Sequence, residues 1–220
     1  MSVYRIGLIV LAMCYAHAAL ADTPNGATIA HQGNGHGVAP CMACHGGNGE
    51  GQSAAGFPRL AGLPQAYLRK QLDDFAHGTR VNATMQPVAS GLSDAERDAL
   101  AAYYSKLPIP ASASTSAPVD DGARAGQVLA TRGRWSASLP ACEQCHGPDG
   151  VGVGDHFPPL LGQSAVYLSN QLHAWQQGSR RNDPLRLMQG VASKLSDADI
   201  TAISTWYAAQ AVAPAKEQQP

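Results

Sequence analysis

The sequence has no excess charge of either sign and few aromatic residues. Lys and Arg total 15 and Asp and Glu total 16, so the formal net charge is −1. This balance excludes the basic footprint of a nucleic-acid-binding protein and an acidic tail. Aromatic residues are only 6% of the chain, whereas it has 23 glycines and 15 prolines. Such a small number of large side chains can build only a small core. A large apolar prosthetic group would complete that core, and a loop-rich soluble protein fits the same composition.

The apolar run at the start of the chain is too short to cross a bilayer. Residues 6–13 follow a single charge at Arg5, and a membrane span needs about 20 apolar residues. The small residues Ala16, Ala18, Ala19 and Ala21 come next. The pattern predicts an export signal over residues 1–21, with cleavage after Ala21 favoured over Ala18. We therefore expect a periplasmic protein without a transmembrane anchor, and peripheral association with the membrane stays open.

No cysteine is left over for a separate structural disulfide. Apart from Cys14 in the predicted signal, the cysteines form two Cys-x-x-Cys pairs, and each pair is followed directly by a histidine. This is the pattern of covalent c-type haem attachment. Two thiols three positions apart can add to the two vinyl groups on one edge of a porphyrin, and the histidine then lies beneath the iron. The sequence predicts two haem c groups, with covalent attachment at Cys41, Cys44, Cys142 and Cys145 and proximal iron ligands at His45 and His146.

Two other kinds of site use paired cysteines. A zinc ribbon usually brings its two pairs ~15–20 residues apart, whereas almost a whole domain separates these pairs. A thioredoxin-like dithiol pair opens a helix in a βαβ context, and the chain has no clear alternating strand pattern. Neither alternative explains a histidine directly after both pairs.

The second motif belongs to a tandem duplication of about 85 residues, the size of a small domain. Matched segments follow both motifs in the same order. They are Phe57-Pro-Arg-Leu-Ala-Gly62 with Phe157-Pro-Pro-Leu-Leu-Gly162, Tyr67-Leu68 with Tyr167-Leu168, Gln71-Leu72 with Gln171-Leu172, Gly78-Thr-Arg80 with Gly178-Ser-Arg180, and Gly91-Leu-Ser-Asp94 with Lys194-Leu-Ser-Asp197. The Pro-, Ser- and Ala-rich residues 108–118 read as an extended linker. We predict domains over 22–107 and 119–212 and a tail over 213–220.

Each unit is predicted to be helical, so the fold class is all-α. Residues 63–76 and 163–176 carry one-sided apolar stripes. Ser93 and Ser196 open capping boxes for helices that run to about residues 106 and 210. Residues 123–130 predict an N-terminal helix in the second unit. The equivalent segment of the first unit, residues 33–37, is rich in Gly, Asn and His and predicts none.

The sixth ligand of each iron separates electron carriers from haem enzymes. Met85 and Met188 lie one in each unit, seven residues before the Leu-Ser-Asp segment. Methionine is ordinarily a core filler, but this matched placement predicts both as distal ligands. Met42 lies inside the first Cys-x-x-Cys pair and cannot reach the opposite haem face. Five further histidines lack counterparts and are predicted to be surface residues, with bis-histidine ligation as the alternative: His31, His36, His77, His156 and His173.

The doubled series Cys-x-x-Cys-His-Gly, Phe-Pro-x-Leu-x-Gly, Tyr-Leu, Gly-x-Arg, Met and Leu-Ser-Asp resembles the dihaem cytochrome c4 family. The resemblance runs from about residue 38 to residue 210. It implies two tandem class I cytochrome c domains, each with His/Met ligation. It further implies that the backbone near Pro58 and Pro158 accepts a hydrogen bond from the proximal histidine. Arg80 and Arg180 would contact the haem propionates, with solvated arginines as the alternative. Before Cys41 the chain departs from the family, because a segment rich in Gly, His and Asn replaces the usual helical lead-in.

The expected function is electron transfer by a soluble dihaem carrier that is not an enzyme. Methionine ligation raises the haem potential, so a high-potential acceptor such as a terminal oxidase would receive the electrons. The donors would be membrane respiratory complexes or a periplasmic dehydrogenase. One alternative is the haem subunit of such a dehydrogenase, for example a flavocytochrome that oxidises sulfide. A dihaem peroxidase is another, and it would need an open coordination site.

Overall fold

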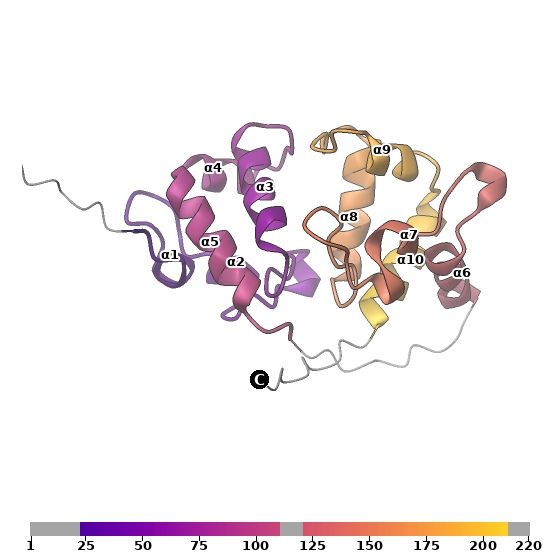
Figure 1. Ribbon diagram of the computed structural model, residues 1–220, viewed down its shortest axis with the longest axis horizontal. Coiled ribbons are helices and arrows are strands. Elements are labelled where there is room, and N and C mark those ends of the chain that lie inside the picture. The colour runs from indigo at the N-terminus through magenta and orange to yellow at the C-terminus, as the bar shows by residue number, and fades with distance from the viewer. Residues whose placement is uncertain (1–22, 111–120, 211–220) are drawn as a thin grey trace, which may run out of the picture.

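The computed structural model describes residues 23–110 and 121–210 (Figure 1). The predicted signal, most of the linker and the tail lie outside these residues. Within the described ranges the chain is helical, and its β-structure is confined to isolated bridges. No helix in this part of the chain is long and apolar enough to cross a membrane. The all-α prediction is confirmed.

The helices occur in the same order in two halves, residues 23–110 and 121–210, which lie side by side (Figure 1). The first half contains α1 (Gly26–Gln32), α2 (Met42–His45), α3 (Gln65–Ala76), α4 (Met85–Ser90) and α5 (Asp94–Lys106), with the 3-10 turn η1 (Ser53–Ala55). The second contains α6 (Asp121–Thr131), α7 (Glu143–His146), α8 (Ala165–Gln176), α9 (Leu187–Ala192) and α10 (Asp197–Ala209), with the 3-10 turns η2 (Trp135–Ala137) and η3 (Pro148–Gly150).

The C-terminal helix of each half begins at a capping box. The Ser93 side chain accepts a hydrogen bond from the Glu96 backbone N–H, and the Glu96 carboxylate accepts one from the Ser93 N–H. Ser196 and Asp199 make the same pair of bonds at the start of α10. A cap of this kind stabilises a helix by about 1 kcal/mol. Both predicted capping boxes are confirmed.

The first half has an N-terminal helix that the sequence analysis did not predict. Residues 33–37 are non-helical as expected, but α1 lies just before them. The Asn25 side chain caps α1 by accepting a hydrogen bond from the Thr28 N–H at 3.1 Å. Ile29 and Ala30 are buried, and α1 packs on α5 as α6 packs on α10. The expectation that the helical lead-in is replaced was therefore wrong, because a seven-residue helix is too short to show a periodic pattern.

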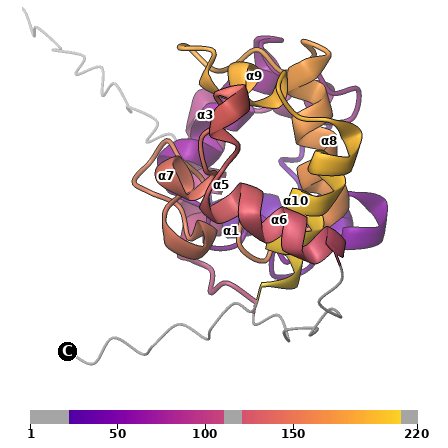
Figure 2. The same cartoon turned by 90° about the vertical axis from the view of Figure 1, so that its right-hand side faces the viewer.

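A glycine lets the first and last helices of each half cross closely. A Cβ added to Gly26 would lie 2.1 Å from the carbonyl oxygen of Ala99 in α5. A Cβ on Gly126 would lie 2.3 Å from the corresponding oxygen of Ala202 in α10. Figure 2 shows α6 crossing α10 at the outer end of the second half. Only glycine allows two backbones to approach this closely.

Each half has its own apolar core. Buried side chains at matched positions on the first, third and last helices contribute to each core. They are Ile29, Leu68, Leu100 and Tyr104 in the first half, and Leu129, Leu168, Ile203 and Tyr207 in the second. The partly buried Cys41 and Cys142 pack against these two cores, so the cores position the haem-attachment motifs.

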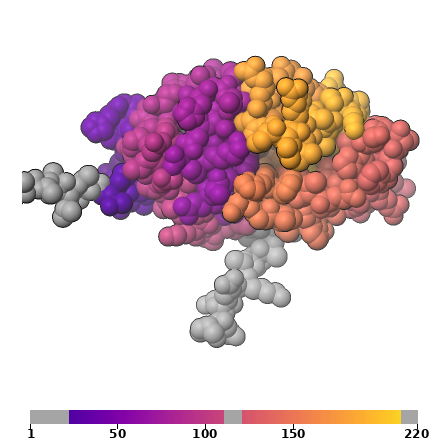
Figure 3. Space-filling model, turned by 45° about the horizontal axis from the view of Figure 1, so that its top comes forward, coloured from indigo at the N-terminus to yellow at the C-terminus, as the bar shows by residue number. Residues whose placement is uncertain are grey.

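The two halves meet along a broad seam (Figure 3). The chain after α3 and the chain after α8 form an antiparallel bridge there between Arg80 and Arg180. The Val81 N–H donates to the Ser179 carbonyl at 2.7 Å, and the Arg181 N–H donates to the Thr79 carbonyl at 2.8 Å. The bridge joins matched positions of the repeat, so the halves are related by an approximate two-fold axis.

Candidate haem sites

Each Cys-x-x-Cys-His segment forms one short helical turn. Cys41 and Cys142 are the N-cap residues of α2 and α7, and His45 and His146 end these helices. Residues i and i+3 of a helix lie on the same face, so the two thiols of each pair share a side. None of the four described cysteines is in a disulfide. Each turn therefore presents two free thiols and a histidine together.

The two histidines are buried and held by backbone carbonyls. Nδ1 of His45 lies 3.0 Å from the Pro58 oxygen, and Nδ1 of His146 lies 2.8 Å from the Pro158 oxygen. Both hydrogen bonds implied by the family resemblance are thus present. A carbonyl only accepts hydrogen bonds, so each Nδ1 carries the proton and Nε2 keeps its lone pair. Burial lowers the pKa of both imidazoles, which favours the neutral form that ligates a metal.

The cysteine environments do not suit a zinc site or a reactive dithiol. Burial raises the pKa of the Cys41 thiol, and it raises the pKa of Cys142 to about 11. A redox-active cysteine reacts as a thiolate and is activated by a lowered pKa. No three His, Cys, Asp or Glu side chains gather as a metal site within residues 23–110 and 121–210. These thiols suit thioether bonds better.

Met85 and Met188 lie at the starts of matched short helices. Met85 is the first residue of α4, and Met188 is the second residue of α9. Both side chains are half-buried. The Asn82 side chain accepts a hydrogen bond from the Met85 N–H, and the Asp183 carboxylate accepts one from the Met188 N–H. A short polar side chain therefore holds each methionine, although the preceding loop is three residues longer in the second half.

Arg80 and Arg180 lie at the seam between the halves, not in solvent. They are 6% and 8% exposed, which excludes the solvated alternative. Arg80 donates to the Tyr167 hydroxyl at 2.8 Å and to Gln171 at 2.6 Å. Arg180 donates in return to the Tyr67 hydroxyl at 3.3 Å and to Gln71 at 3.2 Å. Each guanidinium thus bonds the matched residues of the opposite half.

The seam buries more positive than negative charge. Arg59, which is 3% exposed, donates to the Leu161 carbonyl across the seam at 3.0 Å. Burial lowers the pKa of Arg59 to about 10, so it stays charged at neutral pH. Burial and the neighbouring Arg80 lower the pKa of Arg180. Buried cations without carboxylate partners are strongly destabilised. Anionic groups of a cofactor at this seam would compensate them, so the residues fit a haem with two propionates.

Two residues at the sites were missed in the sequence analysis. Tyr104 and Tyr207 are buried and pack in the cores beside Cys41 and Cys142. The Tyr207 hydroxyl lies against the Cys142 thiol, as the Tyr104 hydroxyl lies against the Cys41 thiol. Burial raises the pKa of both phenols. Each tyrosine lies twelve residues after the leucine of Leu-Ser-Asp, and this shared offset was the available signal.

The other described histidines lie at or near the surface. His31, His36, His77 and His156 are exposed, and His173 is half-buried. His31 contacts the Tyr103 hydroxyl at 2.9 Å and the Met42 sulfur at 3.2 Å. The surface prediction is confirmed for the four exposed histidines.

Known proteins match this chain over most of its length. A family model described as Cytochrome c matches residues 30–108. The thiosulfate dehydrogenase electron acceptor of Thiomonas intermedia is 51% identical over 81% of this chain and 82% of its own. The structure of reduced cytochrome c4 from Pseudomonas stutzeri superimposes with a TM-score of 0.72 at 38% identity, covering 79% of this chain and 94% of that one. This chain belongs to the dihaem cytochrome c4 family.

The structure of the thiosulfate dehydrogenase TsdBA from Marichromatium purpuratum also superimposes on this chain. Its TM-score is 0.77 at 43% identity, and the match covers 83% of this chain but 39% of that chain. Membership of the cytochrome c4 family confirms the resemblance, the fold class and the prediction of covalently bound haem c as the cofactor. The protein is an electron-transfer dihaem cytochrome.

Proposed function

We propose that this cytochrome accepts electrons from a thiosulfate dehydrogenase in the periplasm and passes them to a high-potential respiratory acceptor. The observation that carries the proposal is the 51% identity to the thiosulfate dehydrogenase electron acceptor of Thiomonas intermedia. The match to TsdBA also favours a dehydrogenase partner. The export signal predicted over residues 1–21 supports a periplasmic location. A terminal oxidase or another membrane complex would then be the recipient.

The residues of each site suit an electron-transfer centre. When bound, each haem supplies a one-electron Fe(III)/Fe(II) couple. His45 and His146 present a neutral Nε2 held in place by the Pro58 and Pro158 carbonyls. Met85 and Met188 are the proposed opposite ligands, because they occupy matched helix starts. With both positions filled, neither iron would have the open site that a peroxidase needs.

The proposed ligands can be tested by redox titration of the purified holoprotein, followed by haem absorbance. We expect two haems per chain. Met85→Ala and Met188→Ala should each lower one potential, on the order of 0.1 V within the ~0.8 V range that axial ligands set. Met42→Ala is the control, and it should leave both potentials unchanged. Unchanged potentials in Met85→Ala and Met188→Ala would refute the ligand assignment.

The proposed donor can be tested by mixing the oxidised holoprotein with a thiosulfate dehydrogenase. Adding thiosulfate should reduce both haems, whereas omitting either the enzyme or thiosulfate should leave them oxidised. Dithionite provides the fully reduced reference. A holoprotein that dithionite reduces, but that the dehydrogenase with thiosulfate does not, would show that the donor is another protein.

A further inference from the structure

Two half-exposed valines lie beside the second haem-attachment turn. Val151 and Val153 are 52% and 50% exposed. A Cβ on Gly147, the residue after His146, would meet Val153 at 3.2 Å and Val151 at 3.4 Å. Both side chains therefore lie over the end of α7. Cys145 is exposed in the same turn, so a haem attached there would have its attachment edge near the surface. We call Val151 and Val153 the valine patch.

The first half has polar side chains at the matched positions. Glu50 lies over Gly46 as the valines lie over Gly147, and its carboxylate accepts a hydrogen bond from the Asn48 N–H at 2.8 Å. Gln52 donates to the Ala43 carbonyl at 3.0 Å. The corresponding thiol, Cys44, is half-buried where Cys145 is exposed. The same backbone therefore presents a polar edge in one half and an apolar edge in the other.

Packing within the chain does not account for the valine patch. Neither valine belongs to the buried cluster of the second half or to the side chains packed against it. Contiguous exposed apolar side chains rimmed by polar residues are typical of interaction surfaces. Two carboxylates lie near the patch: Asp149 in η3, two residues before Val151, and Glu143 at the start of α7, which interacts with Asp149. Burial and then the charge of Asp149 raise the pKa of Glu143. Neither carboxylate is in a salt bridge within the described residues.

We propose that the valine patch, with Glu143 and Asp149 at its edge, is the docking face for the electron-donating dehydrogenase. This inference rests on the proposed function. The partner surface would be apolar at its centre and carry Lys or Arg opposite the two carboxylates. Electron-transfer contacts are small, and a few residues at the centre of an interface carry most of its binding energy. The two exposed valines beside the second haem-attachment turn would form the apolar centre of such a contact.

The apolar edge suits the donor better than the polar edge of the first half does. The matched region makes up 39% of a single chain described as thiosulfate dehydrogenase TsdBA, which favours a close association of dehydrogenase and acceptor. Lasting interfaces are more apolar than transient ones. The polar edge around Glu50 and Gln52 suits the brief encounter with the outgoing acceptor. Electrons would then enter at the second half and leave from the first.

The test is the rate at which the dehydrogenase with thiosulfate reduces the holoprotein. Val151→Gln with Val153→Gln gives the second half a neutral polar edge like that of Gln52. We expect the bimolecular rate constant to fall about tenfold. Glu50→Gln, which changes the matched edge of the first half, is the control and should leave the rate unchanged. Raising the salt concentration should slow wild-type reduction, because it screens Glu143 and Asp149 from the partner.

Two further measurements separate docking from damage to the haem site. Both potentials and the rate of reduction by dithionite should stay at wild-type values in the double variant. If the double variant does not bind haem, the single variant Val153→Gln is measured instead. Its bimolecular rate constant should decrease by a smaller factor. A wild-type rate in the valine variants, or an equal decrease in Glu50→Gln, would overturn the docking proposal. Failure of the wild-type protein itself to accept electrons would instead refute the proposed donor, and the docking proposal with it.

Discussion

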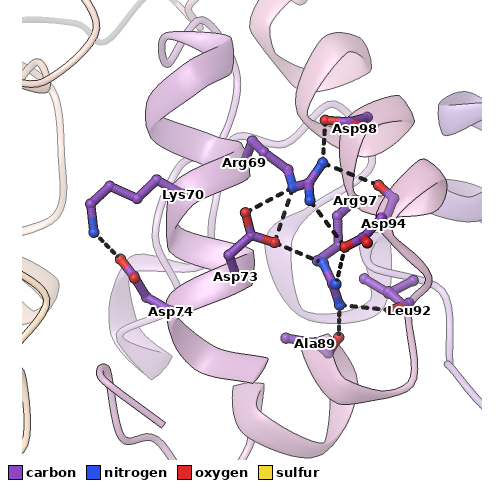
Figure 4. Close-up of polar contacts among 9 residues, drawn as sticks. All are labelled: Arg69, Lys70, Asp73, Asp74, Ala89, Leu92, Asp94, Arg97 and Asp98. Atoms are coloured by element: carbon purple, nitrogen blue, oxygen red, sulfur yellow. Dashed lines mark hydrogen bonds and ion pairs between the residues drawn. The ribbon is translucent and has the colours of Figure 1, made fainter. Parts of the chain in front are cut away.

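In the first half, charged side chains join α3 to α5, whereas an apolar residue occupies the centre of the matching crossing of α8 and α10. Arg69 of α3 contacts Asp73, Asp94 and Asp98, and Arg97 of α5 contacts Asp73 and Asp94 (Figure 4). Arg97 also donates to the Ala89 and Leu92 carbonyls. At the position matched to Arg97, the second half has the fully buried Ile200. The same helix crossing therefore accommodates either charged or apolar side chains, because the shape of the backbone and the spacing of the helices define the crossing.

The largest expected effect tests whether the two halves depend equally on their first helix. Gly26→Ala and Gly126→Ala should each lower the free energy of unfolding by about 3 kcal/mol, since the new methyl would overlap a backbone oxygen. The measurement is denaturant unfolding of the holoprotein, followed by helical circular dichroism. Gly190→Ala in α9 is the control, because its added Cβ meets nothing within 4 Å. A loss confined to Gly126→Ala would show that α1 contributes little.

A smaller effect should follow from giving the first half the apolar contact of the second. Arg97→Ile removes the donor of two carbonyls and a partner of Asp73, and we expect a loss of about 2 kcal/mol because these buried groups lose their hydrogen bonds. Denaturant unfolding of the two proteins gives the difference. Ile200→Val is the matched control in the second half, with a loss of about 1 kcal/mol. An unchanged stability in Arg97→Ile would mean that packing alone holds the α3–α5 crossing.

The smallest expected effect is a change in thermal stability at acidic pH. The hydrogen bond from Arg97 holds the pKa of Asp94 below its ordinary value of 3.8. A carboxyl whose folded pKa is lowered stabilises the fold above its unfolded pKa, and that contribution is lost as the pH falls through the folded value. Asp94→Asn should therefore unfold at a slightly lower temperature than wild type above about pH 4, and the difference should shrink as the pH falls below that value. Melting temperatures measured across this range check it.

The second half supplies the control for the acid experiment. Asp197 occupies the position matched to Asp94, and within the described residues its only possible ion-pair partner is the His173 imidazole at 4.0 Å. Asp197→Asn should change the melting temperature less than Asp94→Asn does. Equal changes in both variants would show that the Arg97 contact is not the cause.

The local sequence predicted the elements whose causes are local. Ser93 and Ser196 mark the starts of α5 and α10, because a capping box needs only residues three positions apart. The two Cys-x-x-Cys-His segments identify the haem-attachment turns for the same reason. Helix α1 was missed although Gly26, Ile29 and Ala30 repeat the spacing of Gly126, Leu129 and Ala130. Its stability comes from packing on α5 and not from its own seven residues.

The sequence by itself determined the all-α duplication and its attachment motifs, which led to the haem assignment. Tertiary structure alone decided that Arg80 and Arg180 reach across the seam, and that Arg59 and Gln163 bond each other's halves. It also placed Val151 and Val153 at the exposed edge of the second site. Local sequence encodes helix starts and covalent chemistry over a few positions. Contacts between residues about a hundred positions apart depend on how the two folded halves meet.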